Sequence, residues 1–154
     1  ETVRRLTEGG YGRYEISNYA RPGFECRHNL VYWNRGDYLG LGCAAHSLMD
    51  GERFENPRSL EEYLAGERRL NREKLTQTDA MEETLMLSTR TTRGMSLRAY
   101  AEDFGVDFEK THEKKLRRLV QLGLIQLEGG FLRLTERGME LQNAVVVELM
   151  DDQP

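Results

Sequence analysis

Residues 124–134 read LIQLEGGFLRL, and two runs of alternating apolar and polar residues flank the pair Gly129 and Gly130. A two-glycine linker between alternating runs is a strong signal for a β-hairpin, because the turn that matches the twist of the strands requires positive φ angles. Gly123 can end a helix before this segment, and Thr135 can cap a helix after it. The sequence therefore predicts a hairpin that lies between two helices.

Helical patterns surround the hairpin. The expected helices run from Asp79 to about Arg90 with Thr78 as cap, over residues 96–104 between Ser96 and Gly105, from about Phe108 to Leu122, and from Thr135 to about Met150. The third places its apolar residues on one side, as a helix against a core does. Three helices, a hairpin and a last helix are the element order of a winged helix. We therefore expect a helical, winged-helix-like domain over residues 75–154.

Residues 1–74 have a less regular pattern. We expect a helix at Thr2–Glu8 that ends at Gly9 and Gly10, a strand at Tyr11–Ser17, an irregular stretch with several glycines at Phe24–Asp50, a helix over residues 59–70 with Ser59 as cap, and a polar connection at Asn71–Thr78. A helix, a glycine turn and a strand in that order form half of an α/β unit. The predicted fold is α+β in two parts.

Composition limits the class of protein. The chain has 154 residues, of which 38% are hydrophobic and 31% charged, as in globular cytoplasmic proteins. No apolar run approaches the roughly 20 residues that cross a bilayer. The first residues, ETVRRLTEGG, contain neither an initiator Met nor a signal peptide, so we interpret the chain as a piece of a longer protein. Cys26 and Cys43 are too few for a disulfide scaffold and match no zinc motif.

A winged helix raises the alternative of DNA binding. The third predicted helix is basic, but residues 76–154 hold 10 basic and 14 acidic side chains, whereas residues 1–75 hold 12 of each. An acidic part disfavours a broad nucleic-acid footprint. Pairs four residues apart, such as Glu113 and Arg117, explain the charged helix as a solvated face. Docking of DNA or protein to this domain is therefore a remote alternative.

Residues 24–47, FECRHNLVYWNRGDYLGLGCAAHS, concentrate the residue types that contact cofactors. They hold the only Trp, both Cys and two of the three His. Histidine and cysteine ligate haem iron, and aromatic rings pack on porphyrin faces, so His28, Cys26, Tyr32 and Trp33 are candidates. The alternative is that the aromatic residues fill a core and the histidine makes an ordinary hydrogen bond. Glycines at 40 and 42 permit either a close approach to a ligand or a tight packing loop.

Three linked motifs carry a resemblance to a known family. They are YEISNYA at Tyr14–Ala20, HNxxYW at His28–Trp33 and YLGLGCAAHS at Tyr38–Ser47. The chain resembles the radical SAM family of oxygen-independent coproporphyrinogen III oxidase-like proteins, and within it the branch of haem chaperones. The segments EETLMLSTRTTRGMSL and LVQLGLIQLEGGFLRLTERGMELQNAVVVEL resemble the C-terminal domain of that family. The resemblance covers almost the whole chain.

The resemblance implies a division of the chain and a set of cofactors. Residues 1–74 would be the last αβ elements of a radical SAM partial barrel, and residues 75–154 the C-terminal domain. The whole protein would bind S-adenosylmethionine and a [4Fe–4S] cluster held by a cysteine triad. Neither cysteine of this chain matches that triad, so we expect this piece to be inactive alone as a radical enzyme.

The resemblance also implies roles for individual residues. The HNxxYW motif, associated with haem handling, is matched by His28, Asn29, Tyr32 and Trp33, with His28 as the expected iron ligand and Cys26 beside it. The loop that approaches S-adenosylmethionine is matched by Gly40, Gly42, Ala45 and His46. The oxidase usually carries an apolar residue where His46 stands, and many relatives have proline and glycine at positions 43 and 44.

Two functions remain open at this point. One is a haem-binding chaperone in haem trafficking, with haem acceptor proteins as partners. The other is an enzyme that oxidatively decarboxylates coproporphyrinogen III in porphyrin biosynthesis. Both imply a tetrapyrrole ligand and a cytoplasmic location. Strand edges left open in a partial barrel would also favour a homodimer.

Overall fold

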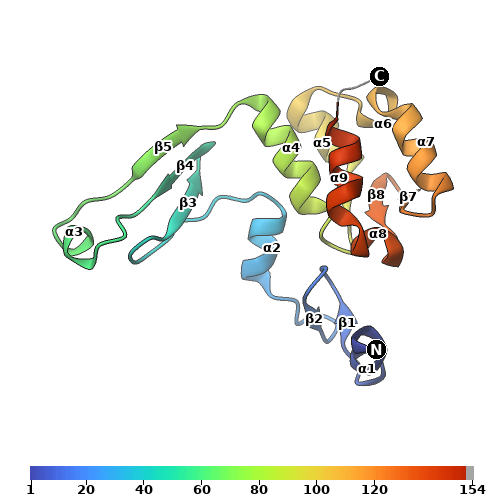
Figure 1. Cartoon of the computed structure of the whole chain (residues 1–154), viewed down its shortest axis with the longest axis horizontal. Coiled ribbons are helices and arrows are strands. Elements are labelled where there is room, and N and C mark those ends of the chain that lie inside the picture. Colours follow the sequence, from blue (N-terminus) through green and yellow to red (C-terminus); the bar gives the residue numbers. More distant parts are fainter. Residues whose placement is uncertain (152–154) are drawn as a thin grey trace.

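The computed structural model describes residues 1–151, so residues 152–154 of the predicted second part lie outside it. The fold is α+β, and every strand pair between residues 1 and 151 is antiparallel. In Figure 1 residues 77–150 form a helical body, and a three-stranded sheet extends from it as an arm, with helix α2 (Arg27–Trp33) beneath the junction. None of the helices in the described range is long and apolar enough to span a membrane.

The helical body has one core. Its elements are α4 (Gln77–Ser88), β6 (Met95–Ser96), α5 (Leu97–Phe104), α6 (Phe108–Thr111), α7 (Glu113–Gln121), β7 (Ile125–Glu128), β8 (Phe131–Leu134), α8 (Glu136–Glu140) and α9 (Gln142–Met150). Strand β8 lies between β6 and β7. The buried apolar side chains of the core cluster all come from residues 85–149, and Leu132 of the central strand is fully buried.

The structure confirms the elements that carried clear end signals. Strands β7 and β8 form the predicted hairpin, and Gly129 and Gly130 adopt φ angles of 58° and 77° in its turn. Ser96 caps α5, which ends at Gly105 in the left-handed conformation. Thr135 caps α8 by accepting a 3.0 Å hydrogen bond from the backbone N–H of Gly138. Side-chain capping and positive φ at glycine are local effects, so the sequence alone could locate them.

Three details of the body differ from the prediction. The cap of α4 is Thr76, not Thr78, because Thr76 and Asp79 form a reciprocal capping box. The third and last predicted helices are each broken, at His112 and at Leu141. In one straight helix Phe108 and Leu116 would point about 80° apart. The break allows both side chains to be buried in the core.

Residues 1–74 contain small elements. They are α1 (Thr2–Glu8), β1 (Gly12–Arg13), β2 (Tyr19–Ala20), α2, β3 (His46–Met49), β4 (Glu52–Glu55), α3 (Leu60–Leu64) and β5 (Leu70–Lys74). The helix at residues 2–8 is confirmed. The arm consists of β3, β4, β5 and α3, with β4 as the central strand. Its buried apolar side chains are Leu48, Phe54 and Pro57.

Four expectations for residues 1–78 are wrong. The strand predicted at Tyr11–Ser17 is only Gly12–Arg13, because the chain turns and buries Glu15. Residues 24–50 are irregular only in part, since they contain α2 and β3. The helix predicted over residues 59–70 ends at Leu64, before Gly66 at a φ of 99°. The predicted polar connection after it holds β5, whose side chains are all exposed and show no apolar alternation.

Polar contacts join residues 1–74 to the helical body. The backbone N–H of Ile16 donates to the carbonyl of Arg90, and the N–H of Thr92 donates to the carbonyl of Tyr14, both at 3.0 Å. The fully buried Glu15 carboxylate lies 3.7 Å from the Arg90 guanidinium. These contacts fix the segment before α2 against the end of α4.

Candidate functional site

Helix α2 presents the predicted iron ligand on an exposed face. His28 and Tyr32 are four residues apart and therefore share a side of the helix. The His28 Nε2 and the Tyr32 hydroxyl are hydrogen-bonded at 2.9 Å. The Tyr32 ring packs edge-on against Tyr38, with ring centroids 4.6 Å apart. His28, Tyr32 and Tyr38 thus form a continuous aromatic strip, which is the candidate site.

The other two motif residues face a different direction. Asn29 Nδ2 donates to the Tyr14 hydroxyl at 3.4 Å. The Arg90 guanidinium lies over the Trp33 ring, 4.6 Å from its centroid. Positions 28 and 33 of a helix point about 140° apart. The structure therefore brings His28 and Tyr32 together and places Asn29 and Trp33 on contacts that anchor α2.

The contacts that anchor α2 and the segment before it are polar, and some of their buried atoms have no hydrogen-bond partner in the described part of the chain. Within residues 1–151, Trp33 Nε1, Arg90 Nε and Glu15 Oε2 are buried without a hydrogen-bond partner. The other carboxylate oxygen of Glu15 accepts a 3.0 Å hydrogen bond from the backbone N–H of Ser17. An opposite charge and a π face stabilise the guanidinium at this junction.

The cysteines do not join the aromatic strip. Cys26 is the residue before α2 and is exposed, while Cys43 is half-buried, and both are free thiols. Among the residues that the structure describes, no group of three or more His, Cys, Asp or Glu side chains could hold a metal ion. A single imidazole can still supply one axial ligand to an iron that a macrocycle already holds.

The glycine loop is held by its own chain. The Asn56 side chain donates to the carbonyls of Gly40 and Gly42 at 3.1 and 2.9 Å. A Cβ at Gly40 would clash with the carbonyl oxygen of His46, so this glycine serves a close backbone approach within the loop. Gly42 has a φ of 98°, and a Cβ at this position would meet no atom within 4 Å. Ala45 accepts from the Asn56 backbone, and the exposed His46 imidazole lies 3.4 Å from the Glu55 carboxylate.

A charged triad beside Tyr38 was not predicted from the sequence. Glu83 of α4 accepts a 3.1 Å hydrogen bond from Arg35 and a 2.5 Å hydrogen bond from Arg53 of β4. The hydrogen bond to Glu83 raises the pKa of Arg53 above its usual range. Burial raises the pKa of Tyr38, although the nearby Arg53 acts in the opposite direction. No sequence signal joins these residues, because 48 and 30 positions separate the arginines from Glu83.

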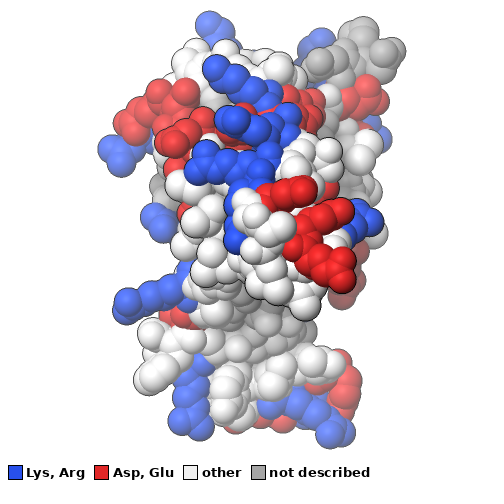
Figure 2. All heavy atoms as spheres, turned by 90° about the vertical axis from the view of Figure 1, so that its left-hand side faces the viewer, with Lys and Arg blue, Asp and Glu red and all other residues white. Residues whose placement is uncertain are grey.

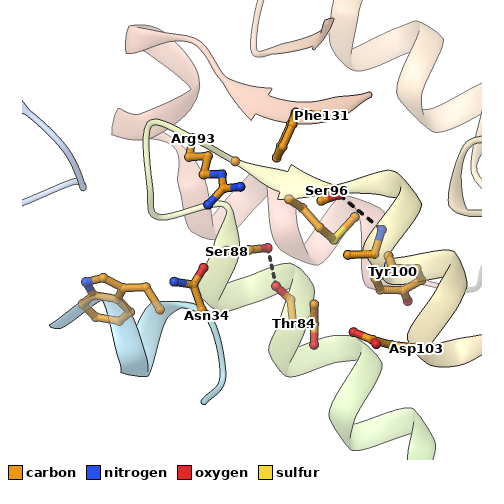
Figure 3. Close-up of a pocket in the computed structure, with 12 residues that line it drawn as sticks. Asn34, Thr84, Ser88, Arg93, Ser96, Tyr100, Asp103 and Phe131 are labelled. Carbon is orange, nitrogen blue, oxygen red and sulfur yellow. Dashed lines mark hydrogen bonds between the residues drawn. The ribbon is translucent and has the colours of Figure 1, made fainter. Parts of the chain in front are cut away.

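Two small cavities flank α2. One of about 150 Å³ is lined by Tyr32, Tyr38, Arg35, Arg53 and Glu83 among others. The other, of about 220 Å³, lies between the end of α2 and the helical body. Figure 3 shows Asn34 on one side of it, with Arg93, Tyr100 and Phe131 from the body on the other. Both volumes are below the roughly 300–1,000 Å³ that enclose a drug-sized ligand. Neither cavity is large enough to enclose a macrocycle.

The charged surface gives little support to nucleic-acid binding. On α7, Arg117 pairs with Glu113, and Arg118 pairs with Glu148 of α9. On the arm, Arg72 of β5 pairs with Glu52 of β4. Figure 2, which views the molecule from the side of the arm, shows a run of Lys and Arg side chains with groups of Asp and Glu side chains on both sides of it. The paired side chains have less charge available for phosphates than unpaired ones would have.

Comparisons with known proteins agree with this arrangement of elements. Residues 75–141 match the family model described as the HemN C-terminal domain. The chain is 32% identical over 151 residues to the heme chaperone HemW of Lactococcus lactis subsp. lactis, covering 96% of this chain and 40% of that protein. It is 33% identical over 148 residues to the heme chaperone HemW of Bacillus subtilis, covering 93% of this chain and 39% of that protein. The chain thus spans about 40% of the length of these relatives.

A solved structure shares the fold. The structure titled "Coproporphyrinogen III oxidase (HemN) from Escherichia coli is a Radical SAM enzyme" superimposes with a TM-score of 0.70 at 19% identity, covering 99% of this chain and 40% of that one. The α+β arrangement is therefore shared along the whole chain. With residues 75–141 as its HemN C-terminal domain, the chain corresponds to the C-terminal portion of a HemW/HemN-like protein.

Proposed function

We propose that this chain binds haem on the exposed face of α2, as part of a HemW-like haem chaperone in haem trafficking. The observation that carries the proposal is the exposed His28 imidazole, which lies at the end of an aromatic strip with Tyr32 and Tyr38. Imidazole is a usual axial ligand of haem iron, and the ring edges and faces of tyrosine pack well against a flat macrocycle. The two HemW relatives are named as heme chaperones.

The donor set fits a haem better than a metal cluster. His28 would supply an axial nitrogen, Tyr32 would pack beside the macrocycle, and Cys26 is a second ligand candidate on the preceding turn. Asn29 and Trp33 would act by holding α2 in place through Tyr14 and Arg90. Two separate free cysteines do not form the triad that a [4Fe–4S] cluster requires, so the cluster ligands would come from another part of the longer protein.

Other parts of the proposal concern the longer protein. The loop with Gly40, Gly42, Ala45 and His46 would lie near S-adenosylmethionine, and residues 1–74 would be the end of a radical SAM partial barrel. The TM-score of 0.70 to the HemN structure supports this placement. Residues 75–151 would form a winged-helix-like domain, supported by the helices and the β7–β8 hairpin. We also propose a cytoplasmic location and haem acceptor proteins as partners.

Haemin titration tests the proposal. Adding haemin to the chain should produce a shifted Soret band that saturates, and His28→Ala should remove most of the shift. His46→Ala is the matched control, because His46 is also an exposed histidine but lies in the arm. Equal effects of the two substitutions, or no Soret shift for the unchanged chain, would contradict haem ligation by His28.

The fold neighbour favours one alternative, oxidative decarboxylation of coproporphyrinogen III. In that case the chain would provide a wall of the substrate pocket in the longer protein. The two functions differ in whether the longer protein converts coproporphyrinogen III or carries haem. Turnover of coproporphyrinogen III by the longer protein would support the enzyme, whereas haem transfer to an acceptor without such turnover would support the chaperone.

A further inference from the structure

The triad beside the aromatic strip has an unbalanced charge. Two guanidinium groups, from Arg35 and Arg53, share the single carboxylate of Glu83. The side chains of Arg35 and Glu83 are only 20% and 15% exposed, so solvent screens the triad incompletely. Glu73 of β5, which lies opposite Arg53 on β4, offsets part of the charge of Arg53. Each guanidinium has five N–H donors, and each donates one hydrogen bond to Glu83. The triad therefore retains donors for a second carboxylate.

The excess charge is next to the proposed haem face. Arg35, Arg53 and Glu83 line the same cavity of about 150 Å³ as Tyr32 and Tyr38. Tyr32 is hydrogen-bonded to His28 at one end of the strip and packs on Tyr38 at the other. The strip thus joins an imidazole to a pair of guanidinium groups. This order of groups suits a ligand that is apolar in its middle and anionic at one edge.

We propose that Arg35 and Arg53 form a carboxylate subsite, which binds a propionate group of the tetrapyrrole that lies against His28 and Tyr32. The proposal rests on the proposed function, since it names the part of the ligand that the second end of the strip recognises. Arginine suits this task because its planar group donates two parallel hydrogen bonds to a carboxylate. The cavity is too small for the macrocycle but can hold a carboxylate group. The subsite would fix which edge of the macrocycle points toward α4.

A metal-free porphyrin separates this subsite from iron ligation. Protoporphyrin IX and its dimethyl ester share the ring, but only the free acid carries carboxylates. Fluorescence titration of the chain should show that the free acid binds about tenfold more tightly than the ester, as charge-assisted hydrogen bonds imply. Added salt should reduce this preference, because the subsite is partly open to solvent. Equal affinities for acid and ester would overturn the subsite.

Substitutions locate the preference in the triad. Arg53→Leu should reduce the acid-to-ester preference to about twofold or less, whereas Arg98→Leu, at an 87% exposed side chain on α5, should leave it unchanged. Glu83→Gln keeps the shape of the side chain but removes the competing charge, so it should increase the preference. A decrease with Glu83→Gln, or an equal loss with Arg98→Leu, would contradict the assignment. Circular dichroism of each variant checks that it remains folded.

The outcomes also distinguish the subsite from haem ligation. His28→Ala should remove the Soret shift of haemin but preserve the preference for the free-acid porphyrin. A Soret shift that depends on His28, together with equal binding of acid and ester, would overturn the subsite and leave the proposed function standing. A preference for the acid without any haemin shift would support the subsite and refute ligation by His28.

Discussion

At the scale of single residues, the hydrogen bond between Tyr32 and His28 limits ligand binding. The Tyr32 hydroxyl is hydrogen-bonded to His28 Nε2, one of the two ring nitrogens that can ligate iron. Iron coordination through this nitrogen has to break that bond, which costs about 1 kcal/mol. Tyr32→Phe keeps the ring and removes the bond, so haemin affinity should rise about fivefold. Soret titrations of both proteins measure this, and weaker binding by the variant would mean that the hydroxyl itself contacts the ligand.

Glu15 gives a second prediction at this scale. It is fully buried, accepts hydrogen bonds from Ser17 and Asn18, and lies beside Arg90. Glu15→Ala leaves the guanidinium without its charged partner and should destabilise the fold by about 2–4 kcal/mol. Urea unfolding measures the change. The control Glu8→Ala breaks only an exposed pair with Arg4, so it should cost less than about 1 kcal/mol. Equal losses of stability in the two variants would show that the buried Glu15 contacts do not stabilise the fold.

The sequence could identify the motif residues but not their partners. HNxxYW is contiguous, so His28, Asn29, Tyr32 and Trp33 are visible as a group. Only the helix shows that His28 and Tyr32 share a face while Trp33 packs with Arg90. The triad at Glu83 joins three segments that are distant in sequence. Such pairings depend on the tertiary fold, which no local pattern encodes.

At the scale of elements, the capping box of α4 makes stability depend on pH. The Thr76 hydroxyl and backbone N–H both donate to the Asp79 carboxylate and lower its pKa below the usual value. A lowered pKa in the folded state means that the ionised carboxylate stabilises the helix. The contribution is complete above the ordinary carboxyl pKa of about 3.9 and is lost as the pH falls through the lower, folded-state pKa.

A substitution at the cap isolates this effect. Thr76→Ala should cost about 1 kcal/mol near neutral pH, as other cap removals do. The difference from the unchanged protein should shrink as the pH falls from about 4 through the lower, folded-state pKa of Asp79. Unfolding curves between pH 2 and 7 would measure this. Thr78→Ala, two positions along the same helix, is the matched control and should show no such pH dependence.

Elements with chemical end signals were predictable, and elements defined only by pairing were not. The hairpin turn at Gly129 and Gly130 and the caps at Ser96 and Thr135 depend on local geometry. Strand β5 has the sequence LNREK, in which every residue is exposed. This segment is a strand because it is hydrogen-bonded to β4. Neither its residue propensities nor an alternation of apolar and polar residues predicts a strand.

At the scale of the whole molecule, burial is concentrated in one part. The core cluster lies entirely within residues 85–149, and Ile16 is the residue from outside the body that packs against it within the described range. Among its apolar side chains the arm buries only Leu48, Phe54 and Pro57. Because apolar burial is the main favourable term in folding, the body should be the stable unit and should position α2 through the contacts of Glu15 and Arg90.

This distribution predicts that residues 75–154 fold alone. The separate piece should keep its helical circular dichroism spectrum and unfold cooperatively in urea, since its core loses only the contact with Ile16. Residues 1–74 alone should show no cooperative transition, because a chain of this size with so few buried apolar groups cannot offset its conformational entropy. Unfolding of both pieces with matched buffers gives the comparison. A cooperative transition in residues 1–74, or its absence in residues 75–154, would show that the core cluster does not determine stability.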